Sequence, residues 1–149
     1  MDQLVAVVDA AERVDVALIA SEGEAVEMQA RVEMLAVYAK RRRLDDLAGR
    51  IGALHLRLKR RIGQLVQPLK PGPKQHDNSS ANWDELSRDE RNARSEAKTL
   101  AERVPDDRFE AGLDEIRAGA RPATVERKLI AETRQTHPCL LYTSDAADE

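Results

Sequence analysis

The sequence lacks most of the residues that covalent or metal chemistry needs. It has one Cys among 149 residues and three widely spaced His, at positions 55, 76 and 137. These provide no disulfide, no Cys-ligated zinc and no H-x-x-x-H or H-E-x-x-H motif. A glycine-rich phosphate loop is missing, and no pair of carboxylates stands out as catalytic. We therefore predict that the protein is not an enzyme and uses no metal or cofactor.

Aromatic side chains and long apolar runs are also scarce. With four aromatic residues, the core must consist of Ala, Leu, Val and Ile. The longest apolar run considered, Leu4 to Val8, is far shorter than the roughly 18–20 residues of a membrane span, and no basic start of a signal peptide precedes it. We expect no membrane association and a cytoplasmic location.

The last eleven residues, 139–149 (CLLYTSDAADE), differ in composition from the rest. They contain the only Cys and no basic residue. Their sequence resembles, residue for residue, one reading frame of a common transposon-derived sequencing adapter. We interpret them as translated adapter, with a natural acidic C-terminus as the alternative. The other 138 residues contain 24 basic and 24 acidic side chains and no Cys.

Helical periodicity dominates the first half. Apolar residues recur at steps of three and four, which predicts amphipathic helices. Ser21 and Glu24 form a capping box that starts the second helix, and the third begins near Leu44. The apolar stripes cover residues 2–20, 25–39 and 47–65.

The second and third helices are predicted to form an antiparallel hairpin. Only the short basic segment Lys40–Arg43 separates their heptad-like stripes. A turn near residues 42 and 43 places residue x beside about residue 85 − x. Three glycines inside the third helix, at 49, 52 and 63, indicate close packing or weak points in the helix.

The second half is predicted to be helical as well, so the fold class is all-α. Ser87 and Glu90 form another capping box; this helix ends near Arg103. Pro105 and Pro122 each start a further helix. The predicted divisions are helices and hairpin at 1–66, a Pro/Gly-rich linker at 67–82 and a helix-turn-helix-like unit at 83–138.

Charge is distributed unevenly. Residues 1–39 have two basic and eight acidic side chains, residues 40–74 have eleven and two, and residues 75–138 have eleven and fourteen. Four cations of the third helix, at 57, 59, 60 and 61, could contact nucleic-acid phosphates. We favour interhelical ion pairs instead, Glu24 with Arg61 and Glu27 with Arg57 or Lys59. For Lys40–Arg43, phosphate contact and complementation of the helix dipole remain equal alternatives.

A basic stripe follows the linker. It predicts the second helix of a helix-turn-helix, preceded by Trp83–Leu86 and lying in the major groove. Acidic residues interleave with these cations, so a mixed, solvated helix surface is the commoner explanation. The stripe consists of Arg88, Arg91, Arg94 and Lys98.

Two motifs carry a family resemblance. Residues 36–66, with AVYAK and LRLKRRIGQLV, and residues 104–109, VPDDRF, resemble a group of small uncharacterised helical proteins of phages, prophages and related bacterial elements. The later part is distantly similar to the helix-turn-helix region of ParB-like partition proteins. The resemblance implies a mobile-element setting and DNA association but transfers no active residues. The stretch SRDERN, residues 87–92, departs from the turn of those proteins.

We therefore predict a non-enzymatic accessory protein that binds double-stranded DNA. Arg88, Arg91, Arg94 and Lys98 would meet the duplex, and Arg41, Arg42 and Arg43 would add nonspecific phosphate contacts. The alternative is a coiled-coil interaction module without nucleic-acid binding, whose hairpin seam forms a homo-oligomer or meets a partner helix.

Overall fold

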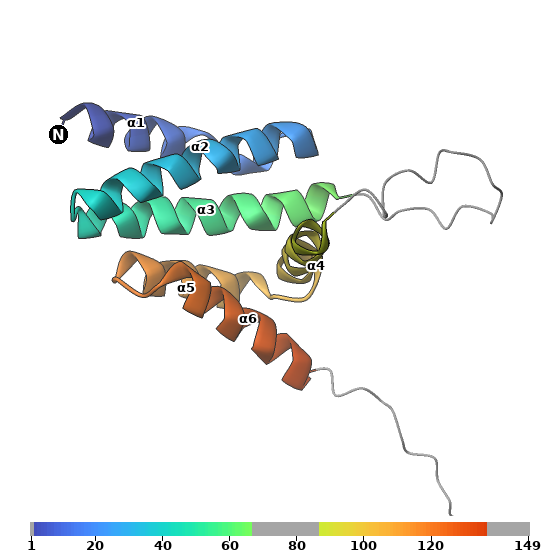
Figure 1. Cartoon of the computed structure of the whole chain (residues 1–149). Coiled ribbons are helices and arrows are strands. Elements are labelled where there is room, and N and C mark those ends of the chain that lie inside the picture. Colours follow the sequence, from blue (N-terminus) through green and yellow to red (C-terminus); the bar gives the residue numbers. More distant parts are fainter. Residues whose placement is uncertain (1, 67–86, 137–149) are drawn as a thin grey trace, which may run out of the picture.

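A computed structural model describes residues 2–66 and 87–136, and these ranges are all-α, as predicted (Figure 1). They contain six α-helices, one short 3-10 helix and no strand. The elements are α1 (Asp2–Arg13), η1 (Val16–Leu18), α2 (Glu22–Arg41), α3 (Asp45–Leu65), α4 (Arg88–Glu102), α5 (Asp106–Arg117) and α6 (Pro122–Thr136). The predicted linker and residues 139–149 lie outside the described residues.

The first helix is shorter than its apolar stripe predicted. α1 ends at Arg13, and the 3-10 helix η1 follows instead of a helix that continues to residue 20. The Asp15 carboxylate accepts a hydrogen bond from the Ala17 amide at 3.0 Å. Such a local side-chain contact offers the backbone an alternative to the helical ladder, which explains the break.

The helical hairpin forms as predicted from α2 and α3. The Ser21 hydroxyl accepts a hydrogen bond from the Glu24 amide and caps the start of α2. At the other end Arg43 adopts a left-handed φ of 55°. The Leu44 amide then donates to the Ala39 carbonyl, which closes the helix end. His55 contacts Gln29 at 3.1 Å, so the predicted offset of 85 − x is also confirmed.

The central helix α3 belongs to two hydrophobic cores. On one side Ile51, Leu54 and Leu58 pack with residues of α1 and α2. On another side Ala53 and Leu56 pack with α4, α5 and α6. The segments before and after the predicted linker are therefore joined through α3.

Glycines let the second half approach α3 closely. A Cβ at Gly52 would lie 2.6 Å from the Pro122 ring, and one at Gly63 would overlap the Ala97 carbonyl of α4. The interpretation of these glycines as close-packing positions is confirmed.

Local signals position α4 to α6 as predicted. Ser87 and Glu90 make both hydrogen bonds of a capping box. The hydrogen bonds that Glu90 receives from the Ser87 amide and hydroxyl lower the pKa of its carboxyl group. Pro122 occupies the first turn of α6, where its missing N–H has no helical partner to lose. Among the described helices, none is long and apolar enough to cross a membrane.

Candidate nucleic-acid interface

The α2–α3 turn presents a group of exposed cations. Lys40 and Arg41 lie in the last turn of α2, where they complement the helix dipole. Arg42 and Arg43 follow at the cap, and the Arg42 guanidinium lies 5.5 Å from the centre of the Tyr38 ring. All four side chains are exposed, and within residues 2–66 and 87–136 none of them forms an ion pair. The end of α2 and the turn that follows it therefore expose four neighbouring positive side chains to solvent.

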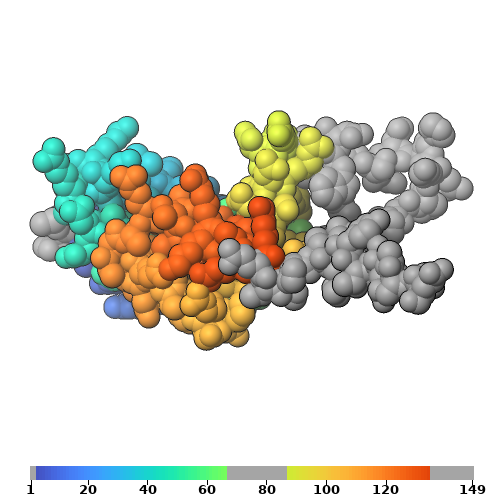
Figure 2. Space-filling model, turned by 90° about the horizontal axis from the view of Figure 1, so that it is seen from below, coloured from blue at the N-terminus to red at the C-terminus, as the bar shows by residue number. Residues whose placement is uncertain are grey.

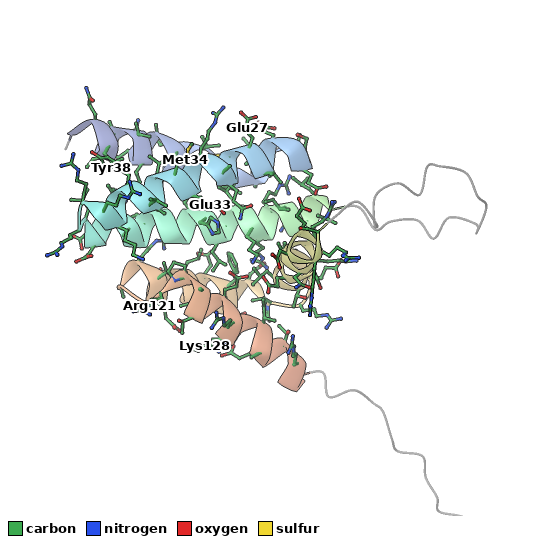
Figure 3. All side chains as sticks on the ribbon, in the orientation of Figure 1. Glu27, Glu33, Met34, Tyr38, Arg121 and Lys128 are labelled. Atoms are coloured by element: carbon green, nitrogen blue, oxygen red, sulfur yellow. The ribbon has the colours of Figure 1, made fainter. Side chains whose placement is uncertain are left out.

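The α5–α6 turn adds a further cation at the same end of the molecule. The α3 backbone at Gly49 lies close to the carbonyl groups of Ile116 and Arg117, so the end of α5 packs beside the start of α3. Figure 3 shows Arg121 at this end, below the α2–α3 turn. Arg121 is exposed and without an ion-pair partner in the described part of the chain.

We call Lys40, Arg41, Arg42, Arg43 and Arg121 the basic end. Sequence reasoning found its first four members as a run of charge. It missed Arg121, which joins them only through tertiary packing. The sequence signal that could have indicated this turn is the close succession of Gly119 and Pro122, which are typical of a helix end and a helix start. In the structure Gly119 has a φ of 108°.

The predicted stripe on α4 divides into two pairs. Arg88 and Arg91 are exposed and have no ion-pair partner among the described residues. Arg94 instead pairs with Glu22 of α2 at 2.8 Å, and Lys98 lies 3.8 Å from Glu102. The side chain of Arg94 is thus engaged in joining α4 to α2. Trp83–Leu86, which we predicted as the preceding part of a helix-turn-helix, lies outside the described residues.

The basic end and α4 lie at opposite ends of α3. α4 crosses near Gly63, whereas the basic end surrounds the start of α3. Asp45, at the start of α3, and Gly63 are 18 residues apart, which is about 27 Å along the helix axis at 1.5 Å per residue. Figure 2 shows the α2–α3 turn and α4 projecting on the same side of the molecule, with α6 between them. The basic end and the pair Arg88 and Arg91 are therefore two separate basic patches on one side of the molecule.

The cations on α3 do not form the ion pairs that we predicted with α2. Arg57 lies 3.8 Å from Glu110 of α5, and Arg61 donates to the Ile19 carbonyl at 2.8 and 3.1 Å. Glu27 pairs with Arg31 on its own helix. The prediction was wrong because it treated the hairpin alone, whereas α5, α6 and the segment before α2 also surround α3.

Lys59 and Arg60 are bound inside the structure. Burial lowers the pKa of Lys59, but its hydrogen bonds with Glu126 and Glu96 outweigh burial and raise the pKa above the usual value. Arg60 donates to the Val104 carbonyl at 3.0 Å, and its guanidinium lies 4.4 Å from the centre of the Phe109 ring. These cations stabilise the packing of the second half on α3 and are not presented to a ligand.

His55 has a structural role that its spacing did not reveal. Its Nε2 atom lies 3.1 Å from the Gln29 amide nitrogen and 3.0 Å from Glu33, both on α2. The ring thus links the two helices of the hairpin. Over the described ranges, no group of three His, Cys, Asp or Glu side chains could hold a metal ion.

Comparison of the chain with protein-family models, with curated proteins and with solved structures found no match. What the protein binds is therefore inferred from its own residues. The surface that combines exposure, like charge and freedom from internal ion pairs is the basic end, with Arg88 and Arg91 as a second group.

Proposed function

We propose that the protein binds double-stranded DNA through its phosphates, as a non-enzymatic accessory protein. The observation that carries this proposal is the basic end: five exposed cations with no ion-pair partner in the described residues. Each cation that neutralises a phosphate releases condensed counterions, which favours binding irrespective of sequence. Cations that already have internal partners contribute much less.

The spacing of the two basic groups supports contact with one duplex. They lie about 27 Å apart along α3 and project on the same side. This separation is somewhat less than one turn of B-form DNA, which repeats every 34–36 Å or so. A duplex along this side would meet both the basic end and the pair Arg88 and Arg91 within about one turn. The proposal includes no reading of base edges.

The biological setting is part of the proposal. The resemblance to phage and prophage proteins supports a role in a mobile element, and such a role places the protein with DNA in the cytoplasm. Arg94 and Lys98 are assigned a smaller part than Arg88 and Arg91, because Glu22 and Glu102 lie beside them. The proposal keeps the nonspecific phosphate contacts by Arg41, Arg42 and Arg43 that the sequence predicted.

The proposal is tested by the salt dependence of binding. The full chain is titrated against a duplex of about 21 base pairs, two helical turns, between about 50 and 200 mM salt. Changing Arg42 and Arg121 to Gln and Arg43 to Asn should reduce the slope of log K against log salt by about 2.7. Asn is chosen because it tolerates the left-handed φ of 55°. Changing Arg88 and Arg91 to Gln should reduce the slope by about 1.8.

A double variant with the same change in net charge as the Arg88 and Arg91 variant serves as the control. Arg13 and Arg103 are exposed cations without ion-pair partners in the described ranges, and they lie outside both basic groups and outside α6. Changing them to Gln should leave the slope nearly unaltered. Absence of binding at low salt, or a loss in the control equal to that in the Arg88 and Arg91 variant, would overturn the proposal.

A further inference from the structure

The outer face of α2 carries an apolar stripe that no other described element covers. Val26, Met34 and Val37 are 47%, 67% and 53% exposed, and the exposed Ala30 lies between them. Steps of four, four and three residues place these four side chains on one helix face. This face is opposite the heptad seam that packs on α3. Single exposed apolar residues are ordinary, but a continuous stripe along a helix indicates a contact surface.

The charges of α2 favour an antiparallel helix as the occupant. The helix begins with Glu22, Glu24 and Glu27 and ends with Lys40 and Arg41. A second α2 aligned in parallel would place acidic beside acidic and basic beside basic ends. An antiparallel second α2 would place each acidic end beside a basic end, which lowers the electrostatic energy and sets the orientation.

We propose that a second copy of this chain binds here, with the two α2 helices antiparallel about a two-fold axis near their midpoints. Such a contact is isologous, because the same face is used twice. Ala30 then lies opposite Met34 of the second copy, and Val26 lies opposite its Val37.

The remaining charges of α2 are compatible with this arrangement. Glu24 and Arg41 are exposed and have no partner within the described residues, so they contribute their full charge to the acidic start and the basic last turn of α2. Arg31 and Glu33 lie near the two-fold axis, where like charges from the two copies approach. Arg31 is paired with Glu27 at 2.6 Å and Glu33 with His55 at 3.0 Å. Figure 3 shows Glu33 on the side of α2 that borders α3 and Glu27 on the opposite side.

Sedimentation equilibrium of the full chain, without DNA, tests the proposal. We expect a dimer, and Met34→Glu should raise its dissociation constant about a hundredfold, since it would bury a charge without a partner. Ala111→Glu, on an exposed site of α5, should leave the constant unaltered. A monomer at all concentrations would overturn the proposal. So would a dimer that Met34→Glu does not weaken, whether or not DNA binds.

Cross-linking decides the orientation. In a Cys139→Ser background, Val26→Cys and Val37→Cys are introduced into separate chains, which are mixed and treated with a short bis-maleimide. We expect cross-links between the two variants, whereas efficient self-linking of Val26→Cys would contradict the antiparallel arrangement.

Discussion

A methyl group added at Gly63 tests how closely α4 approaches α3. An alanine Cβ there would overlap the Ala97 carbonyl and lie 2.8 Å from the Lys98 amide nitrogen. These are backbone atoms and cannot rotate away, so α4 must move as a whole. Overpacking costs up to about 3 kcal/mol, whereas exchanging Gly for Ala in a helix gains about 1 kcal/mol. We expect Gly63→Ala to lower the free energy of unfolding by about 2 kcal/mol.

The matched control is the same exchange at an open site. A Cβ at Gly23 in α2 meets no atom within 4 Å, so Gly23→Ala should raise the free energy of unfolding by about 0.5–1 kcal/mol. Urea unfolding followed by helical circular dichroism measures both, and the melting temperature of Gly63→Ala should fall by roughly 6 °C. If Gly63→Ala is as stable as the unaltered chain, α4 does not pack on α3 as described.

Three further predictions concern charge. Lys59→Met should lower the free energy of unfolding in urea by about 2 kcal/mol, because it leaves the largely buried carboxylate of Glu126 on α6 unpaired. In the unaltered chain the pKa of Lys59 is raised, so its contribution to stability should be complete below pH 10.5 and be lost as the pH rises above 10.5 through that raised pKa. Ser87→Ala removes the hydroxyl but keeps the amide of residue 87, so the pKa of Glu90 should rise only part of the way toward 4.5 in an NMR titration; an unmoved pKa would mean that the hydroxyl does not contact Glu90. The losses of stability from Glu24→Ala and Arg61→Ala should be additive within about 0.5 kcal/mol in a double-mutant cycle, since Arg61 binds the Ile19 carbonyl and not Glu24. A larger coupling energy would show that Glu24 and Arg61 form the ion pair after all.

The elements that the sequence predicted well depend on local chemistry. The heptad-like stripes gave the hairpin and its offset, which the contact between Gln29 and His55 confirms. Ser87 and Glu90 form their capping box within four residues, and Pro122 begins α6 without help from distant contacts. Neighbouring residues carry all the information that these features need.

The features that could not be predicted depend on which helices meet. Arg94 pairs with Glu22, 72 residues earlier in the chain, and no periodicity of α4 indicates that contact. Arg57 and Lys59 find acids on α5, α4 and α6 instead of α2. The predicted contacts of Arg94 and Lys98 with DNA, and of Arg41 to Arg43 with phosphates, stay predictions for the same reason: the fold determines which cations are free, and only a partner shows which are used.

The structure changes what the total positive charge implies for binding. Residues 40–74 contain eleven basic side chains, and if all met phosphates the salt slope would be near 10. Four of them, on α3 from Arg57 to Arg61, are instead engaged with residues of the same chain. The basic end together with Arg88 and Arg91 presents seven free cations, which imply a slope of about 6 for each bound chain. A measured slope near 10 per chain would require further cations at the DNA, either the exposed Arg13, Arg103, Arg127 and Arg134 or the cations that α3 holds internally, whereas a slope of about 6 or less is what the two basic groups alone predict.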